Sequence, residues 1–214
     1  MVEPLSLVLG VAGAAWGVAA DRISSRWPAH EDGSARKMDW RTIVLAAFGA
    51  VALAAVPVRF GGAAERVLFL ALFATLTLQM ATDLDQRLLP GILTLPVRVA
   101  GALVLVWGGD SLVNRQPAWL AVGAAIVLPL VLYVISLPFG DGAFGEGDVV
   151  YLAGVGLVLG AIRLVIAVFA SAIIGGVVIV LLLATRRVTL RSYIPLGPLL
   201  IVGTLWAALL PATS

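Results

Sequence analysis

The chain has 214 residues, of which 61% are hydrophobic and only 12% are charged. Because ordinary soluble domains carry about 25% charged residues, this composition excludes a typical soluble domain and predicts an integral membrane protein. The absence of cysteine excludes disulfides, thiolate catalysis and cysteine-bound zinc, and the net charge of +2 comes without a basic stripe that would bind nucleic acid.

Apolar segments recur along the whole chain, whereas a secretory signal would be one short apolar stretch near the start. A spanning helix needs about 20 residues, so we divide the chain at its charged and Gly/Pro-rich breaks. This division predicts an all-α, polytopic membrane protein with about eight transmembrane helices. Between the sixth and seventh, only Arg163 and the nearby Gly160 mark a boundary. The expected ranges are 4–20, 42–58, 66–82, 92–107, 118–138, 149–162, 164–184 and 194–211.

A long polar stretch, Asp21 to Arg41, separates the first two predicted helices and carries five basic residues. Under the positive-inside rule this loop is cytoplasmic. Alternation of the spans then places ten basic residues on the cytoplasmic side and four on the opposite side. His30, which is the only histidine, lies in the same loop, and we expect it to be solvated rather than bound to a metal.

Two aspartates stand where predicted cytoplasmic loops meet helices. Asp83 follows an uninterrupted apolar run, and Asp148 immediately precedes another. Taken singly, Asp83 is explained as an interfacial charge and Asp148 as a helix cap that accepts backbone N–H bonds. Taken as a pair across a water-filled cleft, they cannot both ionise cheaply, so one keeps a proton while the other activates water for attack on a carbonyl. The pair therefore indicates aspartic-protease chemistry.

Glycines and further acids surround these aspartates. Gly145 and Gly147 let a backbone approach closely and adopt positive φ angles, which suits an extended substrate, although an ordinary turn also explains them. Asp85 is two positions from Asp83, about 200° around a helix, so only one of the two faces the cleft. We expect Asp85 and Glu146 to be supporting or solvated acids.

Three ordered motifs carry a resemblance to a known family. They are TDLDQRLLPGILTLP from Thr82, GEGD from Gly145 and YIPLGPLLIVG from Tyr193. Together they resemble the bacterial type IV prepilin peptidases, membrane aspartic proteases of the G-x-G-D class with a presenilin-like architecture. The resemblance implies that Asp83 and Asp148 are the catalytic pair. The implied substrate-binding residues are Pro90, Gly145, Glu146 and Gly147.

The resemblance also implies a function and a place in the cell. The expected substrate is a membrane-anchored prepilin or pseudopilin of a type IV pilus or type II secretion system, whose short basic leader is removed after a glycine. Hydrolysis is expected at the cytoplasmic face of a bacterial inner membrane, with no metal or cofactor. The expected partners are these substrates and the lipid bilayer, and nucleic acid is not among them.

The chain departs from the family pattern in two places. Val150 stands where the family often has a lysine, two residues after the second aspartate. The loop at 21–41 has no cysteine, whereas bifunctional members carry a zinc-stabilised cysteine module there. We therefore expect a short form with an N-terminal two-helix region (1–65) and a six-helix peptidase core (66–214), and we do not carry over the N-methyltransferase activity of the bifunctional relatives.

Two other classes of function stay open from the residues alone. A small secondary transporter coupled to protons or cations would also use membrane-embedded aspartates and glycine-interrupted helices. Against it, both acids lie near one face of the membrane rather than at its midplane, and no inverted repeat is visible. A membrane scaffold without catalytic activity is the third alternative.

Overall fold

The computed structural model describes residues 4–28, 35–108, 116–139, 144–186 and 196–211. His30 and Tyr193, the first residue of the third motif, therefore lie outside the described residues. Within the described ranges the chain forms eight α-helices and one short 3-10 helix. They are α1 (Pro4–Ser24), α2 (Trp40–Arg59), α3 (Ala63–Gln86), α4 (Gly91–Gly108), α5 (Ala118–Ser136), η1 (Leu137–Phe139), α6 (Glu146–Leu159), α7 (Ala161–Ala184) and α8 (Gly197–Leu209).

The prediction of an all-α, polytopic membrane protein is confirmed. Among the described residues, five helices are long and apolar enough to cross a membrane: α1, α2, α3, α5 and α7. Two of the remaining helices are shorter, because α6 has 14 residues and α8 has 13. At 1.5 Å per residue these two extend only about 20 Å, less than the roughly 30 Å hydrocarbon core.

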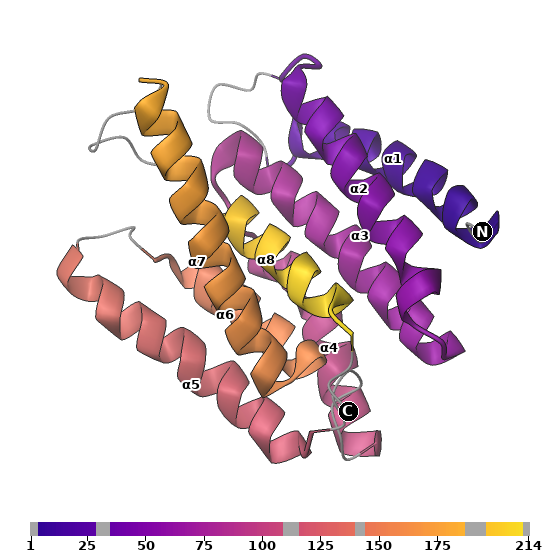
Figure 1. Ribbon diagram of the computed structural model, residues 1–214, viewed down its shortest axis with the longest axis vertical. Coiled ribbons are helices and arrows are strands. Elements are labelled where there is room, and N and C mark those ends of the chain that lie inside the picture. The colour runs from indigo at the N-terminus through magenta and orange to yellow at the C-terminus, as the bar shows by residue number, and fades with distance from the viewer. Residues whose placement is uncertain (1–3, 29–34, 109–115, 140–143, 187–195, 212–214) are drawn as a thin grey trace.

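The helices form two groups with α8 between them (Figure 1). Helices α1, α2 and α3 pack against one another, while α6 contacts α4, α5 and α7. Helix α8 contacts both α3 and α7, so it joins the first group to the second. This central position places the two ends of α8 against residues from several other helices.

Glycines bring α1 and α2 into backbone contact. A β-carbon placed on Gly13 would lie 2.1 Å from the carbonyl oxygen of Gly49, and one on Gly17 would lie 2.1 Å from that of Leu45. Small residues at these positions allow the close helix approach that is common in membranes, where van der Waals packing replaces the hydrophobic effect as the force between helices.

The break between α6 and α7 differs from the prediction. It falls at Gly160, whose φ of 78° is the left-handed region that glycine adopts without strain. Arg163 was expected between the two helices, but it lies within the first turn of α7 and is only 2% exposed. Its guanidinium donates hydrogen bonds to the carbonyl oxygens of Ala207 and, at 2.8 Å, of Pro211, so it satisfies carbonyls that the end of α8 leaves open.

The two ends of the bundle agree with the predicted alternation of helices. Arg59 at the end of α2 donates to the carbonyl of Leu210 at 2.8 Å, so the end of α2 and the end of α8 lie together with Arg163. At the other end of the bundle, Thr42 near the start of α2 bonds Asp21 near the end of α1.

Candidate active site

Asp83 lies in the last turn of α3 and is 5% exposed. Arg87 is the C-cap of this helix and has a φ of 57°, and its backbone N–H donates to the carbonyl oxygen of Asp83 at 2.9 Å. This left-handed residue is a common way for a helix to close, because it satisfies a carbonyl that has lost its partner in the next turn. The carboxylate of Asp83 therefore projects from the final turn of a helix whose end is well defined.

The Asp83 carboxylate lies directly against Gly197, the first residue of α8. A β-carbon on Gly197 would come within 2.7 Å of both Cγ and Oδ2 of Asp83, closer than atoms can approach. The start of a helix is the positive end of its dipole, which favours a carboxylate. Among the described residues Oδ2 of Asp83 has no hydrogen-bond partner.

In the sequence, the segment around Gly197 was interpreted as the third motif of the family resemblance, with no contact assigned to this glycine. Pro198 does follow in the first turn of α8. The contact between Gly197 and Asp83 was missed, because sequence spacing does not reveal which residue a distant glycine faces. The signal that could have found it was the third family motif, which begins at Tyr193 and contains this glycine.

Asp148 is the third residue of α6, and Gly145 is the N-cap of that helix. The backbone N–H of Gly145 donates to Oδ2 of Asp148 at 3.0 Å. The helix cap that explains Asp148 by itself is therefore present. The carboxyl groups of Asp148 and Asp83 also lie within electrostatic range of each other. Asp148 thus combines a capping contact with a position near Asp83.

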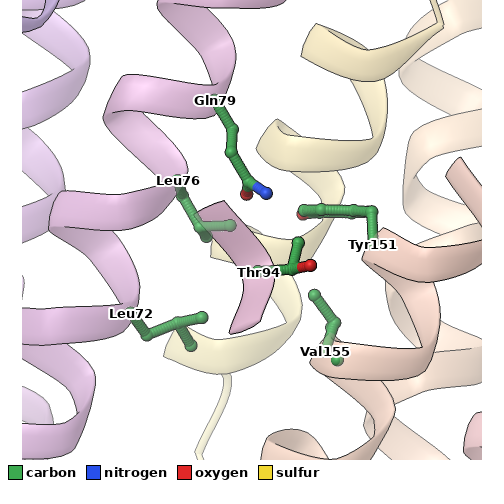
Figure 2. A pocket seen from close by; sticks show the side chains of 7 residues that line it. Leu72, Leu76, Gln79, Thr94, Tyr151 and Val155 are labelled. Atoms are coloured by element: carbon green, nitrogen blue, oxygen red, sulfur yellow. The ribbon is translucent and has the colours of Figure 1, made fainter. Parts of the chain in front are cut away.

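A small cavity is lined by residues of α3, α4 and α6 (Figure 2). Gln79, one turn before Asp83, and Tyr151, one turn after Asp148, both line it. The hydroxyl of Tyr151 forms a 2.7 Å hydrogen bond with Thr204 in α8. Because α3 ends and α6 begins at this end of the bundle, the shared cavity one turn away puts Asp83 and Asp148 at a similar depth.

The glycines of the GEGD motif adopt ordinary backbone conformations, and the expectation of positive φ is wrong. Gly145 has φ −82° and ψ 160°, the extended conformation of an N-cap residue, and Gly147 continues the first turn of α6. A β-carbon on Gly147 would lie 3.1 Å from the Cβ atom and the carbonyl oxygen of Leu89. The expected close approach of a backbone to Gly147 is therefore present, and the backbone is that of the connection between α3 and α4.

The other two predicted site residues frame the same region. Glu146 is the first residue of α6 and is exposed. Pro90 is half-buried just before α4, and its carbonyl accepts the backbone N–H of Leu93 at 3.0 Å. Pro90 therefore serves to begin α4, beside the Leu89 segment that Gly147 contacts.

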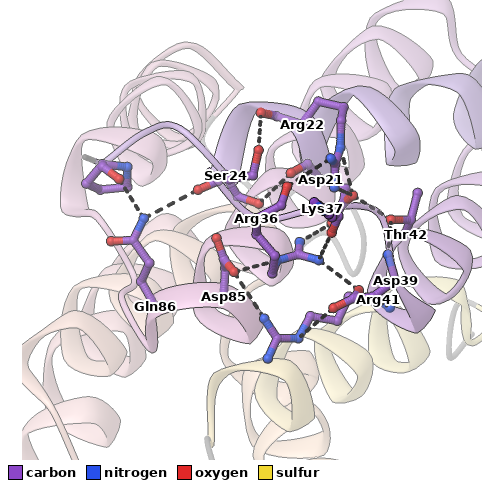
Figure 3. A network of polar contacts seen from close by, with 12 residues as sticks. Asp21, Arg22, Ser24, Arg36, Lys37, Asp39, Arg41, Thr42, Asp85 and Gln86 are labelled. Atoms are coloured by element: carbon purple, nitrogen blue, oxygen red, sulfur yellow. Dashed lines mark hydrogen bonds and ion pairs between the residues drawn. The ribbon is translucent and has the colours of Figure 1, made fainter. Parts of the chain in front are cut away.

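The Asp85 side chain is directed toward Arg36 and Arg41 (Figure 3). Its carboxylate accepts a hydrogen bond from Nε of Arg36 at 2.6 Å and from Nη1 of Arg41 at 3.0 Å, and it is 2% exposed. Asp85 was expected to be either a supporting or a solvated acid. Because its side chain is buried and bonded to two arginines, it is not a solvated acid. Within the described ranges, no group of three histidine, cysteine or acidic side chains is arranged to hold a metal ion.

Comparison with known proteins decides the family of the chain. The model of the type IV leader peptidase family matches residues 70–180, a range that includes Asp83, Asp148 and the GEGD motif. The chain belongs to this family. The resemblance drawn from the three sequence motifs is thereby confirmed. No solved structure matches the chain.

Curated relatives of the type IV leader peptidase family are similar over most of this chain. The prepilin leader peptidase/N-methyltransferase of Burkholderia pseudomallei is 31% identical over 157 residues, which is 73% of this chain and 50% of that protein. Proteins of the same description from Aeromonas salmonicida and Pseudomonas putida are 32% and 29% identical, over 60% and 71% of this chain and 43% and 52% of their own lengths. The chain thus spans about half the length of the curated relatives it matches.

Proposed function

We propose that this protein is an aspartic endopeptidase that removes the leader from type IV prepilins or pseudopilins, with Asp83 and Asp148 as its catalytic pair. The observation that carries the proposal is the pairing of two acids from separate motifs. Asp83 is nearly inaccessible at the end of α3 and lies within electrostatic range of Asp148 at the start of α6. Membership of a peptidase family supports the same activity.

The proposed chemistry uses one proton shared by the two carboxyl groups. Two carboxylates within electrostatic range of each other do not both ionise cheaply, so in the proposed mechanism one is neutral and the other charged. The charged carboxylate takes a proton from water as the water oxygen bonds to the scissile carbonyl carbon, while the neutral acid donates its proton to the carbonyl oxygen. Collapse of the tetrahedral intermediate breaks the C–N bond, and a proton passes to the leaving amine.

The placement of the site suggests how substrate reaches it. Glu146 is exposed at the start of α6, and Gly145, Gly147 and Pro90 lie around the same helix start, so we propose that these four residues line the substrate path. Under the positive-inside rule the basic loop near this end of the bundle is cytoplasmic. The scissile bond is then placed at the cytoplasmic face of an inner membrane, between a basic leader and a membrane-embedded helix.

The test is cleavage of a prepilin by the purified full chain in detergent. Asp83→Asn and Asp148→Asn are each expected to abolish leader removal, read by mass spectrometry as loss of the leader mass. Glu65→Gln is the matched control, because it makes the same acid-to-amide change at the opposite end of α3. Size-exclusion profiles of all variants establish that each one folds.

Three results would overturn the proposal. Undiminished cleavage by either folded Asn variant would remove that aspartate from the mechanism. Absence of cleavage by the unchanged chain on prepilins from its own genome would reject the peptidase. Aspartate-dependent uptake of a proton or cation into proteoliposomes, without cleavage, would favour the transporter alternative. The same mass spectra show whether the new N-terminus is methylated, and we propose that it is not.

A further inference from the structure

A single arginine joins three carboxylates from three parts of the chain at the Asp83 end of the bundle (Figure 3). The guanidinium of Arg36 donates from Nε to Asp85 at 2.6 Å, from Nη1 to Asp39 at 2.7 Å, and from Nη2 to Asp21. Asp21 lies near the end of α1, Asp39 is the N-cap of α2, and Asp85 is in the last turn of α3. All three guanidinium nitrogens are therefore used, each on a different element.

Two of the three partners of Arg36 are among the least accessible charged groups described. The side chains of Asp21 and Asp85 are 0% and 2% exposed, and that of Arg36 is 16% exposed. Burial alone would lower the pKa of Arg36, but the hydrogen bonds that it donates to Asp21 and Asp85 outweigh burial and hold this pKa above its usual value. The guanidinium of arginine is always charged and directs its N–H donors outward within one plane, so it can bond three carboxylates around it. The ammonium of lysine is a compact point charge and does not suit this geometry.

Further contacts complete the cluster and balance its charge. Asp21 also accepts a 3.1 Å bond from Nε of Arg22, and Asp85 also accepts one from Arg41. The three carboxylates are thus matched by three arginines. Gln86, the last residue of α3, donates to the carbonyl of Pro28 at 2.6 Å, so the end of α3 is tied to the segment after α1 by a second route.

The consequence for Asp83 follows from helix geometry. Asp83 and Asp85 project about 200° apart, so fixing the direction of Asp85 also fixes the rotation of the last turn of α3. On one side this turn is held by Arg36. On the other side its Asp83 carboxylate lies against Gly197. A last turn without the clamp would fray and rotate, because terminal turns have few intrahelical partners.

We propose that Arg36 is a positioning residue: by clamping Asp85 to α1 and α2, it holds the last turn of α3 so that Asp83 faces Asp148. The inference rests on the proposed function for its effect on cleavage, but the clamp itself has a physical readout that needs no substrate. Arg36 touches neither aspartate of the catalytic pair and acts on Asp83 only through the helix.

The experiment compares Arg36→Gln with Lys37→Gln in the full chain. Both variants remove one positive charge from the same loop, but the Lys37 side chain is exposed and only its carbonyl contacts the cluster, through a 3.3 Å bond from Arg36. Arg36→Gln is expected to lower kcat for prepilin cleavage by about 10- to 100-fold with KM nearly unchanged, since small misplacement of a catalytic group has effects of this size. Arg36→Lys is expected to restore part of kcat, and Lys37→Gln to keep the unchanged chain's kcat.

The structural readout is the mobility of a nitroxide on Leu88→Cys, just past α3. The chain has no cysteine and Leu88 is 45% exposed, so a thiol-reactive label attaches only at this introduced cysteine. Arg36→Gln is expected to sharpen the spectrum of the label, and Lys37→Gln to leave it unchanged. If Arg36→Gln does not insert into the membrane, Asp85→Asn is the second variant, because it weakens the same contact while keeping a hydrogen-bond acceptor. It is also expected to lower kcat and to sharpen the spectrum of the label.

The outcomes separate this proposal from the proposed function. Suppose that the spectrum of the label sharpens in Arg36→Gln but cleavage does not require Asp83. This result would overturn the catalytic assignment of Asp83 and would still support the clamp by Arg36. An unchanged label and an unchanged kcat in folded Arg36→Gln would overturn the clamp and leave the peptidase standing. A freed label with unchanged kcat, or a rise in KM alone, would also overturn the positioning role, because Arg36 would then stabilise the loop or contact substrate instead.

Discussion

The backbone of Gly197 lies against the carboxylate of Asp83, closely enough that a β-carbon on the glycine would come within 2.7 Å of the Asp83 Cγ atom. The two residues are far apart in the sequence, and one begins α8 while the other lies in the last turn of α3. This contact places the Asp83 carboxylate at the positive end of the α8 dipole, and it makes glycine a requirement at position 197.

Gly197→Ala is therefore expected to impair cleavage by displacing the Asp83 carboxylate. The fall in kcat should be about 10- to 100-fold, the range expected when a catalytic group moves by about 1 Å. Single-turnover cleavage of a prepilin in detergent measures it. Gly176→Ala is the matched control, because no atom lies within 4 Å of a β-carbon at that helical glycine. Equal rates for the two variants would contradict the steric argument.

Arg163→Gln is expected to destabilise the fold without touching the aspartates. It removes charged hydrogen bonds to the end of α8, including the 2.8 Å bond to the carbonyl of Pro211, and leaves those acceptors open. Bonds of this kind contribute about 1.5–3 kcal/mol each, so we expect a loss of roughly 3 kcal/mol and a lower Tm in detergent. Arg186→Gln, at an exposed position just after α7, should change Tm little. A Tm for Arg163→Gln equal to that of this control would show that water or other groups satisfy the carbonyls.

Gly13→Ala tests the contact between α1 and α2. The added methyl would meet the carbonyl oxygen of Gly49 at 2.1 Å, so the helices must separate, and overpacking of this kind typically destabilises by about 1–3 kcal/mol. Thermal unfolding in detergent measures the loss. Gly10→Ala lies one turn earlier on α1, where the new methyl would make an ordinary 3.4 Å contact with Ala54. If neither Gly13→Ala nor Gly10→Ala changes the Tm, then α1 and α2 do not pack this closely.

The parts of the site that could be predicted from sequence are those with a local cause. Asp148 was expected at a helix start, and it caps α6 through the N–H of Gly145, because capping involves residues three apart. The opposite directions of Asp83 and Asp85 also followed from helix geometry alone. The positive φ expected at the motif glycines did not occur, since an N-cap position requires only extended backbone.

The sequence by itself predicted eight helical segments to within a few residues, although about eight transmembrane helices were expected and five of the described helices are long and apolar enough to span a membrane. A bilayer imposes its demands on each segment separately, so length and apolar content are readable one segment at a time. Only the tertiary structure decided that Gly197 meets Asp83, that Arg36 joins Asp21 to Asp85, and that Arg163 is buried against α8 instead of lying in a loop. These contacts depend on how each helix is rotated and packed against partners distant in the chain, and no local pattern of residues specifies that rotation.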